Sequence, residues 1–140
     1  MFFKVLSTDL NLLLTERLQA FTELCRQFYL AGGTALALQL GHRKSEDLDF
    51  FSEHEFDNEL IIQPLMKLGA RIDSESRGAI HTSIKGLRIS FFHYPYPLIR
   101  NTTAIGNIRA ASVEDIACMK VIAIAQRAEK KDFFDMYEIL

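Results

Sequence analysis

A pair of glycines between a short apolar run and an apolar helical pattern constrains the fold of this chain more than any other feature. Residues 28–31 form an apolar run typical of a buried strand, which stops at Gly32 and Gly33, where the chain turns. Residues 35–41 then suit a short helix ending in glycine, and after a polar loop residues 47–51 (DLDFF) suit a second strand. The expected order is strand, glycine turn, helix, strand.

Two aspartates flank a leucine in the second of these strands. Because residues two apart on a strand point to the same face, Asp47 and Asp49 present their carboxylates side by side, while Leu48 and Phe50 point into the core. Adjacent anions repel unless a cation lies between them, and oxygen ligands at this spacing suit Mg²⁺, or Mn²⁺, completed by water and phosphate oxygens. A solvated acidic pair is the alternative interpretation of so short a motif.

The glycine turn adds a second chemical feature. Gly32 and Gly33 carry no side chains where strand becomes helix, so the first helical N–H groups are open to an anion, and Thr34 can cap the helix. Because the next strand returns Asp47 and Asp49 to the same crevice, a nucleoside triphosphate (NTP) and its metal fit this arrangement. A turn that only permits close packing is the alternative.

The remaining chain carries further helical and strand patterns. Amphipathic helices are expected over residues 8–28, 57–68, 112–126 and from about 130, and a hairpin over residues 79–85 and 87–94. Pro64 predicts a kink or a break in the second helix, and Ser112 with Asp115 forms a capping-box pattern. Since the chain ends inside a helical pattern, we expect one domain over residues 1–140 that lacks part of its helical tail.

Composition excludes several classes of protein. With 49% hydrophobic residues and a net charge of −2, the chain can build one packed core and has no global basic excess typical of nucleic-acid binders. No apolar stretch reaches the length of a membrane span, and no secretory signal pattern is present at the N-terminus. The two cysteines, Cys25 and Cys118, lie in apolar helical patterns and predict buried thiols. We therefore expect a cytoplasmic protein without a membrane partner.

Two blocks of sequence together resemble a known family. Residues 28–51 (FYLAGGTALALQLGHRKSEDLDFF) and 111–137 (ASVEDIACMKVIAIAQRAEKKDFFDMY) are similar to the AbiEii/AbiGii nucleotidyltransferase-like toxins. The resemblance implies an α+β fold of the polymerase-beta-like nucleotidyltransferase type, with a small mixed sheet flanked by helices and with C-terminal helices. It also implies that Asp47 and Asp49 hold Mg²⁺ and that the triphosphate lies near Gly33 and Thr34.

The second block adds residues to the implied site. By resemblance, Lys120 reaches a phosphate, Asp132 or Asp135 makes a late polar contact, and Arg127 and Lys131 form a local basic patch. The residues alone leave other interpretations open. Lys120 also suits a helix lysine whose stem lies along apolar surface, and Asp132 suits ordinary surface charge.

One position departs from a complete polymerase-type site, which has a third carboxylate on a neighbouring strand. The candidate strand (LRISFFHY) has Ser90 there, so the attacking hydroxyl lacks its obvious base. The resemblance implies transfer of a nucleoside monophosphate from an NTP to an RNA such as tRNA, or to a protein, by the toxin of a toxin–antitoxin pair with a cognate antitoxin. A module that binds a nucleotide or partner without turnover is the alternative.

Other residues carry weaker signals. None of the four histidines shows a metal-ligand spacing. Arg43 and Lys44 suit a solvated loop better than an anion contact. The aromatic residues around the hairpin suit a core, with Tyr94 and Tyr96 kept as candidate contacts.

Overall fold

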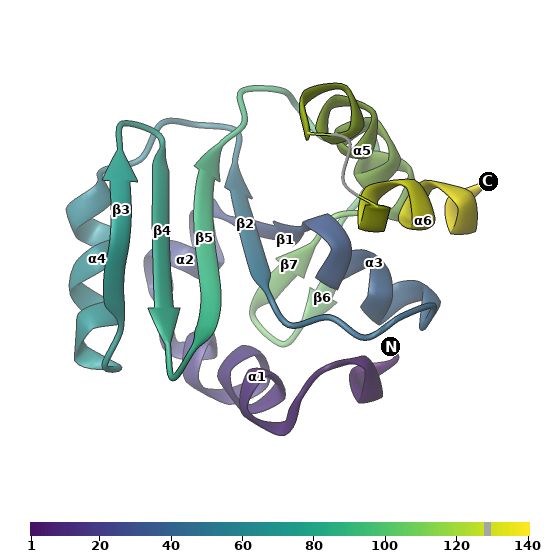
Figure 1. Cartoon of the computed structure of the whole chain (residues 1–140). Helices are drawn as coiled ribbons and strands as arrows, with labels where there is room; N and C mark the ends of the chain where they lie inside the picture. Colours follow the sequence, from purple (N-terminus) through teal and green to yellow (C-terminus); the bar gives the residue numbers. More distant parts are fainter. Residues whose placement is uncertain (128–129) are drawn as a thin grey trace.

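A seven-stranded mixed sheet organises the chain in a computed structural model, which describes residues 1–127 and 130–140, with side chains for all of these except Arg127. The strand order is β3-β4-β5-β2-β1-β7-β6 (Figure 1). The strands are β1 Tyr29–Ala31, β2 Leu48–Ser52, β3 Arg71–Ser76, β4 Ala79–Ile84, β5 Leu87–His93, β6 Thr103–Ile105 and β7 Ile108–Ala110. The expected α+β class with a mixed sheet is confirmed.

The helices surround this sheet. They are α1 Thr8–Leu12, α2 Thr22–Gln27, α3 Gly32–Leu40, α4 Asn58–Lys67, α5 Val113–Arg127 and α6 Lys130–Ile139. In Figure 1, α2 and α4 lie behind the sheet, whereas α3, α5 and α6 gather on its right-hand side. The expected strand, glycine turn, helix and strand are confirmed as β1, α3 and β2, and α3 ends at Gly41 in the left-handed conformation with φ 66°.

Two helix predictions need correction. The helix expected over residues 8–28 is interrupted by a π-helical turn and a 3₁₀ turn between α1 and α2. Of the kink or break expected at Pro64, the break is wrong, because α4 continues through it. The proline leaves the carbonyl of Leu60 without its helical donor, but Leu60 is exposed to water, and the buried Ile61 and Leu65 hold the helix on the core.

The alternation predicted for β2 is confirmed, with one change at its start. Leu48 and Phe50 are fully buried, and Phe50 stacks on Phe91 of β5. Asp49 points to the opposite face, but Asp47 lies just before the first residue of the strand. Strand β2 pairs with β1 in antiparallel and with β5 in parallel orientation, so the carboxylate strand lies in the middle of the sheet.

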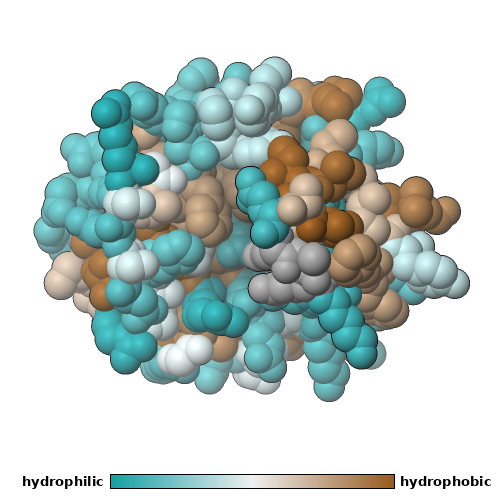
Figure 2. Space-filling model, turned by 45° about the horizontal axis from the view of Figure 1, so that its top comes forward, coloured by the Kyte–Doolittle hydropathy of each residue, from teal (hydrophilic) through white to brown (hydrophobic). Residues whose placement is uncertain are grey.

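The C-terminal helices expose apolar side chains on one face of the molecule, as Figure 2 shows. The exposed apolar residues of these helices include Val121, Ile122, Phe133, Phe134 and Tyr137. Cys118 of α5 is also exposed and Cys25 is half-buried, so the prediction of two buried thiols is wrong. Among the described helices, none combines the length and apolar character that crossing a bilayer requires.

Candidate active site

The glycine turn lies against the carboxylate strand. Gly32 has a φ of 66°, which only glycine adopts without cost, and a Cβ there would lie 3.0 Å from Oδ2 of Asp49. Ala31, at the N-cap of α3, makes no side-chain cap, so the positive end of this helix keeps N–H groups available for an anion. The glycines therefore bring the start of α3 next to a carboxylate.

Thr34 has a different role from the predicted helix cap. Its buried hydroxyl donates a hydrogen bond to the backbone carbonyl of Asp47 and pairs with the hydroxyl of Ser45 at 2.5 Å. Helix α3 begins two residues earlier, at Gly32, so Thr34 lies within its first turn. Thr34 thus ties the start of α3 to the loop that leads into the first aspartate.

A charged cavity of about 290 Å³ contains both aspartates. Its walls are formed by Gly33, Thr34, Arg43, Lys44, Ser45, Glu46, Asp47, Asp49, Arg88, Lys120 and Lys131. The guanidinium of Arg88 on β5 lies 3.3 Å from Oδ2 of Asp47. Carboxylates and cationic side chains therefore share one cavity at the start of β2.

The donor set of this cavity fits Mg²⁺ held jointly by protein and nucleotide. Among the described residues, no three or more histidine, cysteine, aspartate or glutamate side chains gather as a metal cage. Asp47 and Asp49 supply two carboxylates, and Mg²⁺ commonly takes one or two, completing its shell with water and substrate phosphates. The residues therefore suit a metal that arrives with an NTP better than one bound by protein alone.

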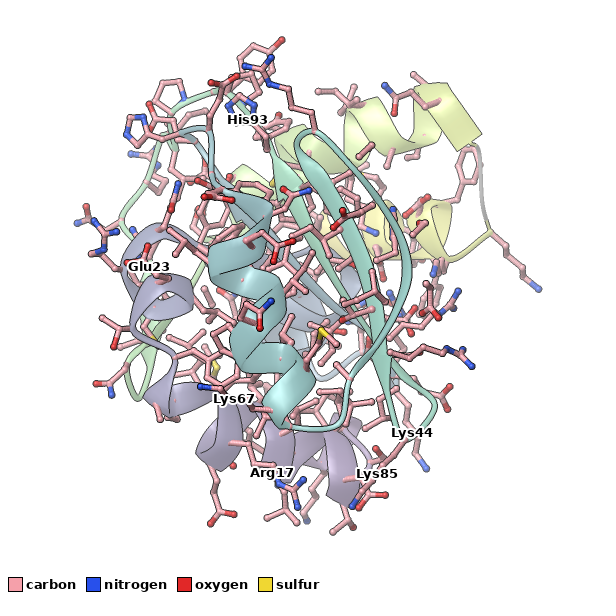
Figure 3. All side chains as sticks on the ribbon, turned by 90° about the vertical axis from the view of Figure 1, so that its left-hand side faces the viewer. Arg17, Glu23, Lys44, Lys67, Lys85 and His93 are labelled. Carbon is pink, nitrogen blue, oxygen red and sulfur yellow. The ribbon has the colours of Figure 1, made fainter. Side chains whose placement is uncertain are left out.

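A second cavity, of about 470 Å³, lies at the other end of β2 and β5. Aromatic and apolar side chains form most of its wall: Phe51, Phe92, Tyr94, Tyr96, Ile116, Met119 and Ile122. Asp49 and Lys120 line both cavities. In Figure 3 the labelled His93, which lines the aromatic cavity, lies at the top, and Lys44, which lines the charged one, lies at the bottom.

This aromatic cavity corrects the prediction of an aromatic core for Phe92, and it contains Tyr94 and Tyr96, the two candidate contacts. Phe91 is fully buried in the core, as expected. Phe92, Tyr94 and Tyr96 instead face the cavity, and Tyr96 is 58% exposed. The reason is the alternation of β5, which sends Phe91 to the core face and Phe92 to the face that carries Asp49.

Buried charges join the two C-terminal helices. Nζ of Lys120, on α5, lies 2.7 Å from Oδ1 of Asp132 and 2.8 Å from Oδ2 of Asp135, both on α6. All three side chains are buried, with Lys120 only 4% exposed. Two alternatives were open from sequence: a Lys120 stem lying along apolar surface, and Asp132 as ordinary surface charge. The buried ion pairs exclude both.

Asp135 also binds the loop that precedes the aspartates. Its carboxylate accepts hydrogen bonds from Nε and Nη2 of Arg43 at 2.7 and 3.0 Å and contacts Nε2 of His42 at 2.6 Å. Burial acts to raise the pKa of Asp135, but the hydrogen bonds from Arg43, Lys120 and His42 outweigh it and hold the pKa well below its ordinary value. The Asp135 hydrogen bond in turn raises the pKa of Arg43.

Arg43 is therefore not part of a solvated loop, contrary to prediction. Its guanidinium lies directly over Gly33, so close that a Cβ at that glycine would collide with Nη2. The side chain is 19% exposed and lines the charged cavity. A fixed cation thus lies at the start of α3, beside the N–H groups of the first helical turn.

The other implied residues lie as follows. Lys131 is exposed and lines the charged cavity, together with Lys120. The side chain of Arg127 lies outside the described part of the chain. His42, Arg43 and Arg88 were not assigned to the site from sequence, because the spacing of basic residues alone does not reveal which of them meet across the fold.

Comparison with known proteins identifies the group to which this chain belongs. The profile of the family described as nucleotidyl transferase AbiEii toxin, Type IV TA system, matches residues 14–103 and 88–140. The chain is a member of the AbiEii family. The resemblance inferred from the two sequence blocks is thereby confirmed, and the family is one of nucleotidyltransferases.

This AbiEii-family chain also has a similar relative among known proteins. It is 43% identical over 122 residues to the uncharacterized protein aq_aa25 of Aquifex aeolicus (strain VF5), covering 84% of this chain and 59% of the relative. The chain thus spans less than two thirds of the length of that protein.

Solved structures share the fold. JHP933 from Helicobacter pylori superposes with a TM-score of 0.61 at 22% identity, covering 94% of this chain and 66% of the other. ANT(2'')-Ia in complex with adenylyl-2''-tobramycin superposes with a TM-score of 0.67 at 18% identity, covering 95% and 88%. At these identities the likeness establishes the nucleotidyltransferase fold of the AbiEii chain.

Proposed function

We propose that this protein is a Mg²⁺-dependent nucleotidyltransferase that transfers a nucleoside monophosphate from an NTP to a hydroxyl of an RNA, such as tRNA, or of a protein. The observation that carries the proposal is the meeting of Asp47 and Asp49 with the start of α3 and a group of cations in one cavity. Membership of the AbiEii family supports a role as the toxin of a toxin–antitoxin pair.

Each part of the charged cavity has a chemical task in this proposal. Asp47 and Asp49 hold the metal, which, when bound, neutralises phosphate charge during transfer. Gly32, Gly33 and Thr34 form the start of α3, whose N–H groups receive phosphate oxygens.

Cationic side chains complete the phosphate site. Arg43 and Lys120 supply charge fixed by Asp132 and Asp135, and a fixed donor loses little freedom when the nucleotide binds. Lys131 adds an exposed cation, and we assign Arg127 to the same patch by resemblance.

The aromatic cavity supports a site for the nucleobase or for the acceptor. It adjoins the charged cavity at Asp49 and Lys120, so a ligand occupying both would have its α-phosphorus near that boundary. Tyr94 and Tyr96 meet edge to face at 5.0 Å and present ring surface on which a base stacks without sequence preference.

The test is transfer of label from α-³²P NTPs to RNA and protein of a cell extract, with Mg²⁺. Asp47→Asn/Asp49→Asn should abolish labelling. Glu53→Gln/Glu55→Gln is the matched control, because these exposed acids have the same spacing and change the net charge equally, beyond the end of β2. Labelling that survives in the Asp47/Asp49 variant, or fails equally in both variants, contradicts the proposal.

Ser90 favours a second candidate function, a module that binds a nucleotide without turnover. Asp49 pairs in register with Ser90 on β5, where a third carboxylate would complete a polymerase-type site. NTP binding by calorimetry that depends on Asp47 and Asp49, with no label transferred to any acceptor, is the outcome that favours this module over the enzyme.

A further inference from the structure

A row of polar side chains crosses three strands beside the aspartates. In the parallel pairing of β2 and β5, Asp49 lies opposite Ser90, and in the antiparallel pairing of β4 and β5, Ser90 lies opposite His81. Residues paired in register share a face of the sheet, so all three side chains lie on one face. Nδ1 of His81 lies 3.0 Å from Oγ of Ser90, which joins the two by a hydrogen bond.

Ser90 is not among the residues that line either cavity, but its neighbours on the same face of the sheet are. On β5, Arg88 is two residues before Ser90 and lines the charged cavity, whereas Phe92 is two residues after it and lines the aromatic cavity. Asp49, beside Ser90, lines both. Ser90 is buried, while His81 is exposed and meets the ring of Phe92 edge to face at 5.3 Å.

Charged side chains of both neighbouring strands lie near His81. Across from it, β3 contributes Asp73, whose pKa is lowered chiefly by hydrogen bonds from Arg71 and Ser83 and also by the charge of His81. On the other side β5 contributes Arg88, which pairs with Asp47. His81 is exposed, so its imidazole can exchange a proton with water.

We propose that Ser90 and His81 form a proton relay that takes the place of the missing third carboxylate. As the acceptor oxygen bonds to the α-phosphorus and the bond to pyrophosphate breaks, the acceptor hydroxyl gives its proton to Oγ of Ser90. Ser90 passes its own proton to Nδ1 of His81, and pyrophosphate leaves with the bonding electron pair. His81 then releases the proton to water.

This relay rests on the proposed nucleotidyl transfer, and the test separates the two. Label transfer is measured from pH 5 to 9 for the wild type, for His81→Asn and for Ser90→Asp/His81→Asn. Asparagine keeps a polar atom near the position of Nδ1 but takes up no proton in this range. His54→Asn is the matched control, because His54 is an exposed histidine outside both cavities.

The relay predicts three results. His81→Asn loses at least about 100-fold in rate, within the usual range for general base catalysis, and loses the fall in rate at acidic pH. Ser90→Asp/His81→Asn regains most of the rate, because the aspartate supplies a carboxylate base where Ser90 stood. His54→Asn behaves as the wild type.

Other results overturn the relay. A His81→Asn variant that keeps the wild-type rate, or that loses rate but keeps the acidic fall, shows that His81 is only structural. If the wild type transfers no label, that result refutes the proposed function and not the relay. The hydrogen bond between His81 and Ser90 can then still be measured by NMR, which needs no catalysis. The ¹⁵N resonance of Nδ1 in His81 should shift in Ser90→Ala, and an unchanged resonance refutes the hydrogen-bonded pair.

Discussion

Replacing Asp135 with asparagine should destabilise the protein strongly, although the residue lies five positions from the last residue described. The carboxylate makes four short contacts with nitrogen atoms of His42, Arg43 and Lys120 and is fully buried. Asparagine offers one acceptor oxygen and turns an amide N–H₂ group toward cationic donors. The change therefore leaves the buried His42 side chain and the partly buried Arg43 side chain without their anion.

The loss of unfolding free energy depends on which contacts each partner of Asp135 keeps in the variant. Removing one partner of a buried ion pair costs about 3–5 kcal/mol. Lys120 keeps Asp132 at 2.7 Å, and Arg43 is partly open to water, so we expect the lower end, about 3 kcal/mol. For a chain of this size that corresponds to a fall in Tm of roughly 12 °C.

Urea unfolding followed by circular dichroism at pH 7 measures this change. Glu138→Gln is the control, because Glu138 is exposed on the same helix and loses the same charge. Arg43→Met/Asp135→Leu should cost less than Asp135→Asn alone, since it removes both charges of the pair. A loss below about 1 kcal/mol for Asp135→Asn would refute the view that this network holds α6 in place.

Three further predictions concern other features. Gly33→Ala should weaken NTP binding about fivefold or more in calorimetry, roughly 1 kcal/mol, because its Cβ displaces the Arg43 guanidinium; unchanged affinity would place the phosphates elsewhere. The folded-state pKa of Asp135 lies below its ordinary 3.8, so its contribution to stability is complete above about pH 4 and is lost as the pH falls further. The loss of stability with falling pH should therefore be less steep in Asp135→Asn than in the wild type. Equal slopes would argue against the ionised network. Maleimide should label the exposed Cys118 about tenfold faster than Cys25, which is half-buried and has a pKa raised by burial; equal rates in a peptide map would contradict the described burial.

Local patterns predicted the central part of the fold well. The apolar run, the glycine pair and the alternation around Asp49 each reflect neighbours in sequence, and β1, α3 and β2 follow from them. Strand β3 was not predicted, because its residues (RIDSES) are mostly exposed and show no apolar alternation. The helix does not break at Pro64, because the buried face of α4 outweighs the lost hydrogen bond.

The candidate site, like the fold, was predicted from the sequence only in part. The sequence selected Asp47, Asp49 and the glycines from spacing, and it selected Lys120 and Asp132 by family resemblance. It did not reveal the role of Arg43, because the partner of Arg43 lies 92 residues away in sequence and no local pattern records that contact.

The sequence by itself determined the glycine turn, the carboxylate strand and the family, because each is written in short stretches of neighbouring residues. Only the tertiary structure decided which charges meet. Helix docking joins Asp135 to Arg43, and the pairing of β2 with β5 places Asp49 beside Ser90. These contacts depend on the packing of elements distant in sequence, which residue periodicity does not encode.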